Sequence, residues 1–185
     1  MNKIIFFLMI TSVAFSQKEY KETDDSIIIW NQYKKLNWED YNGEIDSDMY
    51  GSAYTVYRIE IIPNKIFVDD KDQIQNIDDV NIVTYFYKNK SWTTSYGIPL
   101  LAHEQLHFDI AELFARKIRK RFSELKNNKE YRFSQYQMEY DKLMNACKNF
   151  QKKYDRETKH GSDIGVNKHW VNTVKNSLKE LKDYS

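Results

Sequence analysis

The sequence of 185 residues contains one cysteine, two prolines and five glycines. A single cysteine cannot form a disulfide within the chain, and it excludes zinc sites built from several thiolates. Cys147 occupies an apolar position in a helical pattern, so we interpret it as a small buried hydrophobic residue. With so few prolines and glycines there is no linker and no low-complexity segment, which indicates one globular domain.

Long hydrophobic runs are absent after the first residues. Lys3 precedes the apolar stretch 4–15, which is shorter than the roughly 20 residues of a transmembrane helix. Small side chains stand before Gln17, as they do at a signal-peptide cleavage site. The sequence therefore predicts a signal peptide over residues 1–16 and a mature domain over residues 17–185. We expect this domain to be periplasmic or secreted, without stable membrane insertion.

No excess of charge of one sign is present either. The chain has 28 basic and 27 acidic residues, and loss of Lys3 with the signal peptide leaves the mature chain formally neutral. Because nucleic-acid binding needs a basic surface, no nucleic-acid partner is expected. The basic run 116–121 shares a helical pattern with apolar residues, so we interpret it as a solvated helix face. The oligomeric state is not indicated.

Two kinds of periodicity divide the chain. In the first half, β-branched and aromatic residues predict strands over 26–30, 52–62, 65–69 and 81–87. From Pro99 onward, apolar residues recur at spacings of three and four, which predicts helices over 99–125, 133–160 and 166–181. Strands that precede helices, instead of alternating with them, predict an α+β domain with a mostly antiparallel or mixed sheet.

The first predicted helix carries the motif His103-Glu104-Gln105-Leu106-His107. Two histidines four residues apart lie about 40° apart around a helix, so both imidazoles can reach one ion. Both lie on the apolar side, where buried imidazoles need polar partners, and a zinc ion would be one. Glu104 lies about 100° from His103, where it can reach a metal-bound water without binding the metal. The motif predicts zinc ligands at His103 and His107 and a catalytic base at Glu104.

A catalytic zinc site needs a third protein ligand, which this helix does not offer. The end of the second predicted helix supplies His160, which we favour, and Glu157 as the alternative, because both three-histidine and two-histidine-one-glutamate sites occur. The fourth position stays open to water. Asp155 or Glu157 could orient a ligand histidine. Tyr154 is our candidate for a catalytic donor to the oxyanion, beside Arg156 and His169.

Three segments resemble a known family in the same order along the chain. They are Leu36-Asn37-Trp38-Glu39-Asp40-Tyr41-Asn42-Gly43, residues 101–112 around the histidine motif, and Tyr154-Asp155-Arg156-Glu157-Thr158-Lys159-His160-Gly161. They resemble the DUF922 family of bacterial secreted zinc-dependent proteases. The resemblance implies a zincin-like fold, zinc as cofactor, and a peptide or protein substrate. One departure is that Asn167 precedes Trp170 by three residues, where a glutamine is typical of the family.

These patterns favour an exported metallopeptidase that hydrolyses peptide bonds with a zinc-activated water and Glu104 as general base. A substrate peptide could add to the sheet along the strand 81–87. The alternative is a non-catalytic exported binding domain with a structural zinc whose coordination is closed. In a further alternative, no metal binds and the two histidines are hydrogen-bonded core residues.

Overall fold

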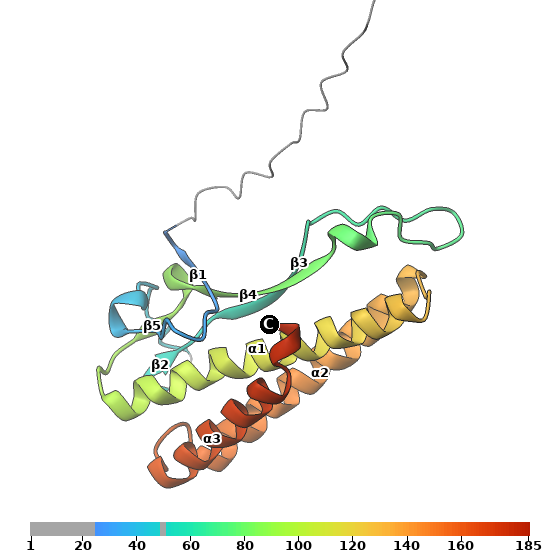
Figure 1. The fold of residues 1–185 in the computed structure, drawn as a ribbon. Helices are drawn as coiled ribbons and strands as arrows, with labels where there is room; N and C mark the ends of the chain where they lie inside the picture. Colours follow the sequence, from blue (N-terminus) through green and yellow to red (C-terminus); the bar gives the residue numbers. More distant parts are fainter. Residues whose placement is uncertain (1–24, 49–50) are drawn as a thin grey trace, which may run out of the picture.

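The chain folds into small antiparallel sheets followed by three long helices (Figure 1). The computed structural model describes residues 25–48 and 51–185. The predicted signal peptide 1–16 lies outside the described residues, as does the start of the predicted mature domain, so both stay predictions. The order of strands and helices confirms the predicted α+β class.

Strand β4 (Asn81–Tyr87) is the centre of the larger sheet. It pairs antiparallel with β1 (Ile27–Ile29) on one side and with β3 (Tyr57–Ile62) on the other. Alternate side chains of β4 are buried, because successive residues of a strand point to opposite faces of the sheet. The hypothesis that a substrate adds to the strand 81–87 is therefore wrong, since β3 pairs along one edge, while β1 pairs with residues 85–87 on the other and Arg119 donates to the carbonyl of Ile82. A second, two-stranded sheet joins β2 (Ala53–Tyr54) to β5 (Trp92–Thr93).

One predicted strand, over residues 65–69, is wrong. The backbone of this segment bonds to a neighbouring loop instead of to a strand. Phe67 N donates to the side-chain oxygen of Asn76, whose amide nitrogen donates back to the carbonyl of Lys65. Backbone pairing is confined to an isolated antiparallel bridge between Val68 and Ile74. Because the Asn76 side chain takes the place of a partner strand beside this bridge, the segment joins no sheet. The predicted strand 52–62 is also divided into β2 and β3, with Thr55 and Val56 between them.

The three predicted helices are present with boundaries close to those expected. They are α1 (Ile98–Asn127), α2 (Phe133–Thr158) and α3 (Ile164–Glu180). Pro99 stands in the first turn of α1, where its missing N–H costs no helical hydrogen bond. Asp163 caps α3 by accepting a hydrogen bond from Val166 N. Among the helices of residues 25–48 and 51–185, none is long and apolar enough to cross a membrane.

Helix α1 lies between the sheet and the other two helices, as Figure 1 shows. On the sheet side, Phe108 packs with Ile28 and Phe86. On the helix side, Ile110 belongs to a second apolar cluster, which includes Cys147 of α2. Cys147 is 1% exposed, so its interpretation as a buried residue is confirmed. Because both sides of α1 are covered, even its polar residues become buried.

The clearest such residue is Glu112, whose carboxylate binds two arginines of its own helix. Glu112 accepts hydrogen bonds from Arg116 Nε and Arg119 Nη1, each at 3.0 Å, and from Thr84 Oγ1 at 2.8 Å. Arg116 is 3% exposed and also donates to the carbonyl of Leu178 at the end of α3. The interpretation of the run 116–121 as a solvated face is therefore wrong at Arg116, since its charge links α1 to α3.

Replacing Glu112 by alanine should destabilise the fold strongly, because Arg116 would stay buried without its counter-charge. Removal of one partner from a buried ion pair costs about 3–5 kcal/mol. Glu124→Ala is the matched control on the same helix, since Glu124 pairs with Arg121 at the surface and such pairs contribute below about 1 kcal/mol. Urea unfolding of both variants measures the difference. Equal losses would contradict a structural role for the Glu112 cluster.

Candidate metal centre

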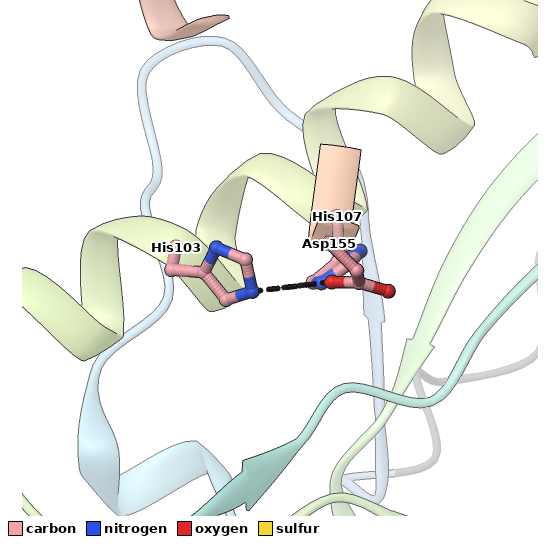
Figure 2. Close-up of side chains that lie close together, drawn as sticks. All are labelled: His103, His107 and Asp155. Atoms are coloured by element: carbon pink, nitrogen blue, oxygen red, sulfur yellow. Dashed lines mark hydrogen bonds and ion pairs between the residues drawn. The ribbon is translucent and has the colours of Figure 1, made fainter. Parts of the chain in front are cut away.

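Three side chains from two helices converge on one point. His103 and His107 lie one turn apart on α1, and Asp155 reaches them from α2 (Figure 2). The two Nε2 atoms are 3.2 Å apart. Asp155 Oδ1 lies 3.3 Å from Nε2 of His103 and 3.0 Å from Nε2 of His107. Three potential ligand atoms therefore form a nearly equilateral triangle.

This triangle has the size that a tetrahedral zinc site requires. With zinc–ligand bonds of about 2.0–2.1 Å, the ligand atoms of a tetrahedron are about 3.3 Å apart. The three observed separations lie at or slightly below this value. Two imidazoles and one carboxylate are also donors that suit zinc better than calcium or magnesium, which prefer oxygen ligands. The residues present thus fit a zinc ion.

The orientation of His107 is fixed by Gln151 of α2. Gln151 Oε1 lies 2.6 Å from Nδ1 of His107, while the Gln151 amide nitrogen donates to the His107 carbonyl at 2.9 Å. An acceptor at Nδ1 favours the tautomer with its proton there, which leaves the lone pair of Nε2 facing the centre of the triangle. Sequence analysis did not identify Gln151, although it lies four residues before Asp155 and on the same side of its helix.

His103 is held mainly by packing. Tyr154 of α2 stacks on its ring with centroids 4.6 Å apart, and the backbone of Gly161 covers another part of the same ring. Nδ1 of His103 is buried and has no hydrogen-bond partner among the described residues. Its Nε2 therefore makes all the polar contacts of the ring, with His107 and Asp155.

The electrostatics of the site favour a positive charge between these groups. Burial alone would lower the pKa of His107, but the hydrogen bond to Asp155 and the nearby charges of Glu104 and Asp155 outweigh it, so the pKa is raised. Burial likewise opposes ionisation of Asp155, yet hydrogen bonds to His103 and His107 hold its pKa below the usual range. Asp155 is thus a carboxylate at neutral pH.

Glu104 is 4% exposed and follows His103 on α1. Its Oε2 accepts a hydrogen bond from the hydroxyl of Thr55 at 2.7 Å, and the hydroxyls of Thr55 and Tyr41 lie 2.9 Å apart. Since the Thr55 proton goes to Glu104, Tyr41 must donate to Thr55. The pKa of Tyr41 is raised mainly by burial and further by the charge of Glu104, so Tyr41 stays protonated. Neither Thr55 nor Tyr41 was identified from the sequence.

Two residues considered as the third ligand lie apart from the triangle. Glu157 points toward α3, where its carboxylate accepts a hydrogen bond from the indole nitrogen of Trp170 at 3.0 Å. His160 follows the end of α2 in a left-handed conformation, and its side chain is 58% exposed. Its Nδ1 lies 4.0 Å from Asp155 Oδ1. The structure thus brings Asp155 to the two histidines and leaves His160 at the rim.

Tyr154, the candidate oxyanion donor, is fully buried. Its hydroxyl lies 2.5 Å from Oδ1 of Asn167 and 3.1 Å from the carbonyl of His103. Burial raises the pKa of this phenol, with a smaller contribution from the charge of Glu104. The hydroxyl proton is therefore retained and shared between protein acceptors. Tyr154 therefore positions His103 through ring stacking and a hydrogen bond to its carbonyl. Asn167 of α3 holds Tyr154 in place by accepting a hydrogen bond from its hydroxyl.

Fold and site together define an α+β protein with a candidate two-histidine, one-aspartate metal centre between adjacent helices. Residues 88–161 match the model of a family described as "Bacterial protein of unknown function (DUF922)", which confirms the resemblance found in the sequence. The match contains all three candidate ligands, Glu104 and Gly161, but it covers less than half of the chain. No curated protein and no solved structure matches the sequence.

Gly161→Ala should weaken metal binding, because a methyl group there would lie 2.9 Å from Cγ of His103, and the backbone φ of +81° disfavours any side chain. Displacement of residues that hold a metal ligand typically lowers metal affinity by about 10–100-fold. Gly165→Ala is the control, since the added methyl would meet only Asp163 Oδ1 at 3.6 Å. Zinc titration against a competing chelator compares the two. Equal affinities would show that the Gly161 contact does not position His103.

Proposed function

We propose that this protein is an exported zinc-dependent metallopeptidase with a zincin-like active site. His103, His107 and Asp155 would hold the zinc ion, and Glu104 would act as the general base. One observation carries the proposal. Three ligand atoms converge with the spacing of a tetrahedral site, and a buried carboxylate stands on the next residue of the same helix. All four residues lie within the segment that matches the DUF922 family, whose description assigns no function.

A zinc ion bound there would lower the pKa of a coordinated water and polarise a substrate carbonyl. Glu104 is the chain's own acid–base group for the same step. Thr55 holds one oxygen of its carboxylate, which fixes the direction of the other. Glu104 would accept a proton from the attacking water and return it to the amine that leaves when the peptide bond breaks. Tyr41 supports this role by orienting Thr55.

Strand β3 is an edge strand to which a peptide substrate could add, once it displaces the Tyr140 hydroxyl that donates to the Ile59 carbonyl at 2.9 Å. A hollow of about 590 Å³ follows this strand and is lined on its other side by Tyr140 and Met144 of α2. Tyr57, at the start of β3, interacts with Gln151, the residue that orients His107. A peptide extended along β3 would therefore lead toward the candidate metal centre.

The rival function is a non-catalytic binding domain in which zinc only joins α1 to α2. The nearness of His160 to Asp155 favours this rival in one respect, since a fourth protein ligand would close the coordination. The two functions differ at Glu104, which a structural site does not need. They also differ at His160, which only a closed site requires as a ligand.

Metal content by mass spectrometry tests the ligand assignment. The purified protein should contain one zinc per chain after reconstitution, and Asp155→Asn should lose most of it because the carboxylate oxygen is a ligand. Glu157→Gln should retain zinc, since that carboxylate binds Trp170. Zinc retained in Asp155→Asn and lost in Glu157→Gln would reverse the assignment. Zinc lost in His160→Ala would favour the closed structural site.

Glu104→Gln tests catalysis separately from metal binding. Glutamine keeps the size of the side chain and can still accept a hydrogen bond from Thr55, but it cannot take up a proton at neutral pH. Zinc content should stay unchanged while hydrolysis of a peptide library falls by about 10²–10⁴-fold. Glu157→Gln is the control for loss of a carboxylate near the site. A native protein that holds zinc but cleaves no peptide of the library would point to the rival function.

A further inference from the structure

A second cavity lies on the side of α1 that faces away from the histidines. It has a volume of about 1120 Å³ and lies between residues 30–36, the first half of α1, and α3. At 100° per residue, Leu101, Gln105 and Asp109 point 160–240° away from His103, so the cavity and the candidate metal centre use opposite faces of the helix. The size is at the upper end of ordinary small-molecule sites.

Most of the accessible surface of this cavity is apolar, and seven of its 18 lining residues are aliphatic. Leu36 and Leu106 are buried at its floor, and α3 adds Val171 and Leu178. At its mouth, Ile98 is 82% exposed. Together with the half-buried Leu101 and Val171, Ile98 leaves aliphatic surface of the cavity open to solvent.

Charge is distributed unevenly around this apolar interior. Asp109 is the only acidic residue of the lining, and it is neutralised by Lys35 at 3.1 Å. On the opposite wall, Lys175, Lys179 and Lys182 follow one another along α3 and its end. Within residues 25–48 and 51–185, no carboxylate lies within ion-pair distance of these three lysines. The cavity therefore combines an apolar interior with three lysines that form no ion pair within the described residues.

We propose that this cavity binds a single-chain anionic amphiphile, a molecule with an aliphatic tail and a carboxylate or similar anionic head. The tail would lie against Ile98, Leu101 and Val171, where it removes apolar surface from water. The head would meet the lysines of α3, whose ammonium groups attract an anionic head more strongly than a neutral one. This site is separate from the candidate metal centre, so the proposal does not depend on peptidase activity.

Isothermal titration calorimetry with laurate, kept below its micelle concentration, tests the proposal on the purified full chain. The triple variant Lys175→Gln, Lys179→Gln, Lys182→Gln should weaken binding by about tenfold or more. The control triple variant Lys148→Gln, Lys152→Gln, Lys168→Gln removes the same charge from exposed helix positions outside the lining, and it should bind like the native protein. Binding should also weaken with added salt.

A second variant tests the apolar part of the site. Ala102 is exposed and lines the cavity, so Ala102→Trp should obstruct the cavity and weaken laurate binding strongly while circular dichroism shows an unchanged helix content. Absence of laurate binding to the native protein would overturn the proposal, as would equal losses in the two triple variants. Binding to phosphatidylglycerol vesicles but not to monomeric laurate would overturn it in favour of a membrane-binding surface.

Discussion

The packing of Tyr154 against both histidine rings is the contact on which the candidate metal centre depends. Its ring stacks on His103 and meets His107 edge-on, so α2 crosses α1 at the height of the motif. Trp170 of α3 packs on the other side of Tyr154, and Asn167 binds its hydroxyl. Because Asp155 is the next residue along α2, the same contact brings its carboxylate to the histidines. Contacts from three helices thus fix Tyr154, and Tyr154 in turn fixes the position of Asp155 without being a candidate ligand itself.

The sequence was sufficient to predict the two candidate histidine ligands but not Asp155, the third candidate ligand. Helix geometry explains this difference. The apolar stripe of α2 runs through Cys147 and Tyr154. Relative to Cys147, Asp155 lies about 80° to one side of the stripe and Glu157 about 80° to the other. Periodicity cannot decide which side faces α1. In the structure Asp155 faces α1, and Glu157 faces Trp170 of α3. His160 lies beyond the helix, where a left-handed turn sets its direction.

The same limit explains the other differences between sequence and structure. The alternation of Asn81–Tyr87 was sufficient to predict β4, because half its side chains meet one apolar surface. The phase of α1 gave the buried position of His103 correctly, but it also placed Arg116 on a solvated face, whereas this residue is 3% exposed. Neighbours on both sides bury Glu112 and Arg116 together. To predict that such a pair is buried, one must know which residues cover the second face of the helix. These residues are distant in the chain, and they include Thr84 and Leu178.

The clustering of acids around His107 also bears on how metal and proton relate at this site. The raised pKa of His107 means that a proton on this ring stabilises the folded chain at pH values below the unfolded pKa, and that this contribution is lost as pH rises through the folded value. A metal cation bound to Nε2 of His107 would replace the proton, and the negative charges of Glu104 and Asp155 would stabilise it in the same way. A bound metal and a proton would therefore compete for one position. The fold provides this position with a fixed geometry and a negative environment, so metal binding would become favourable in the pH range where the proton leaves.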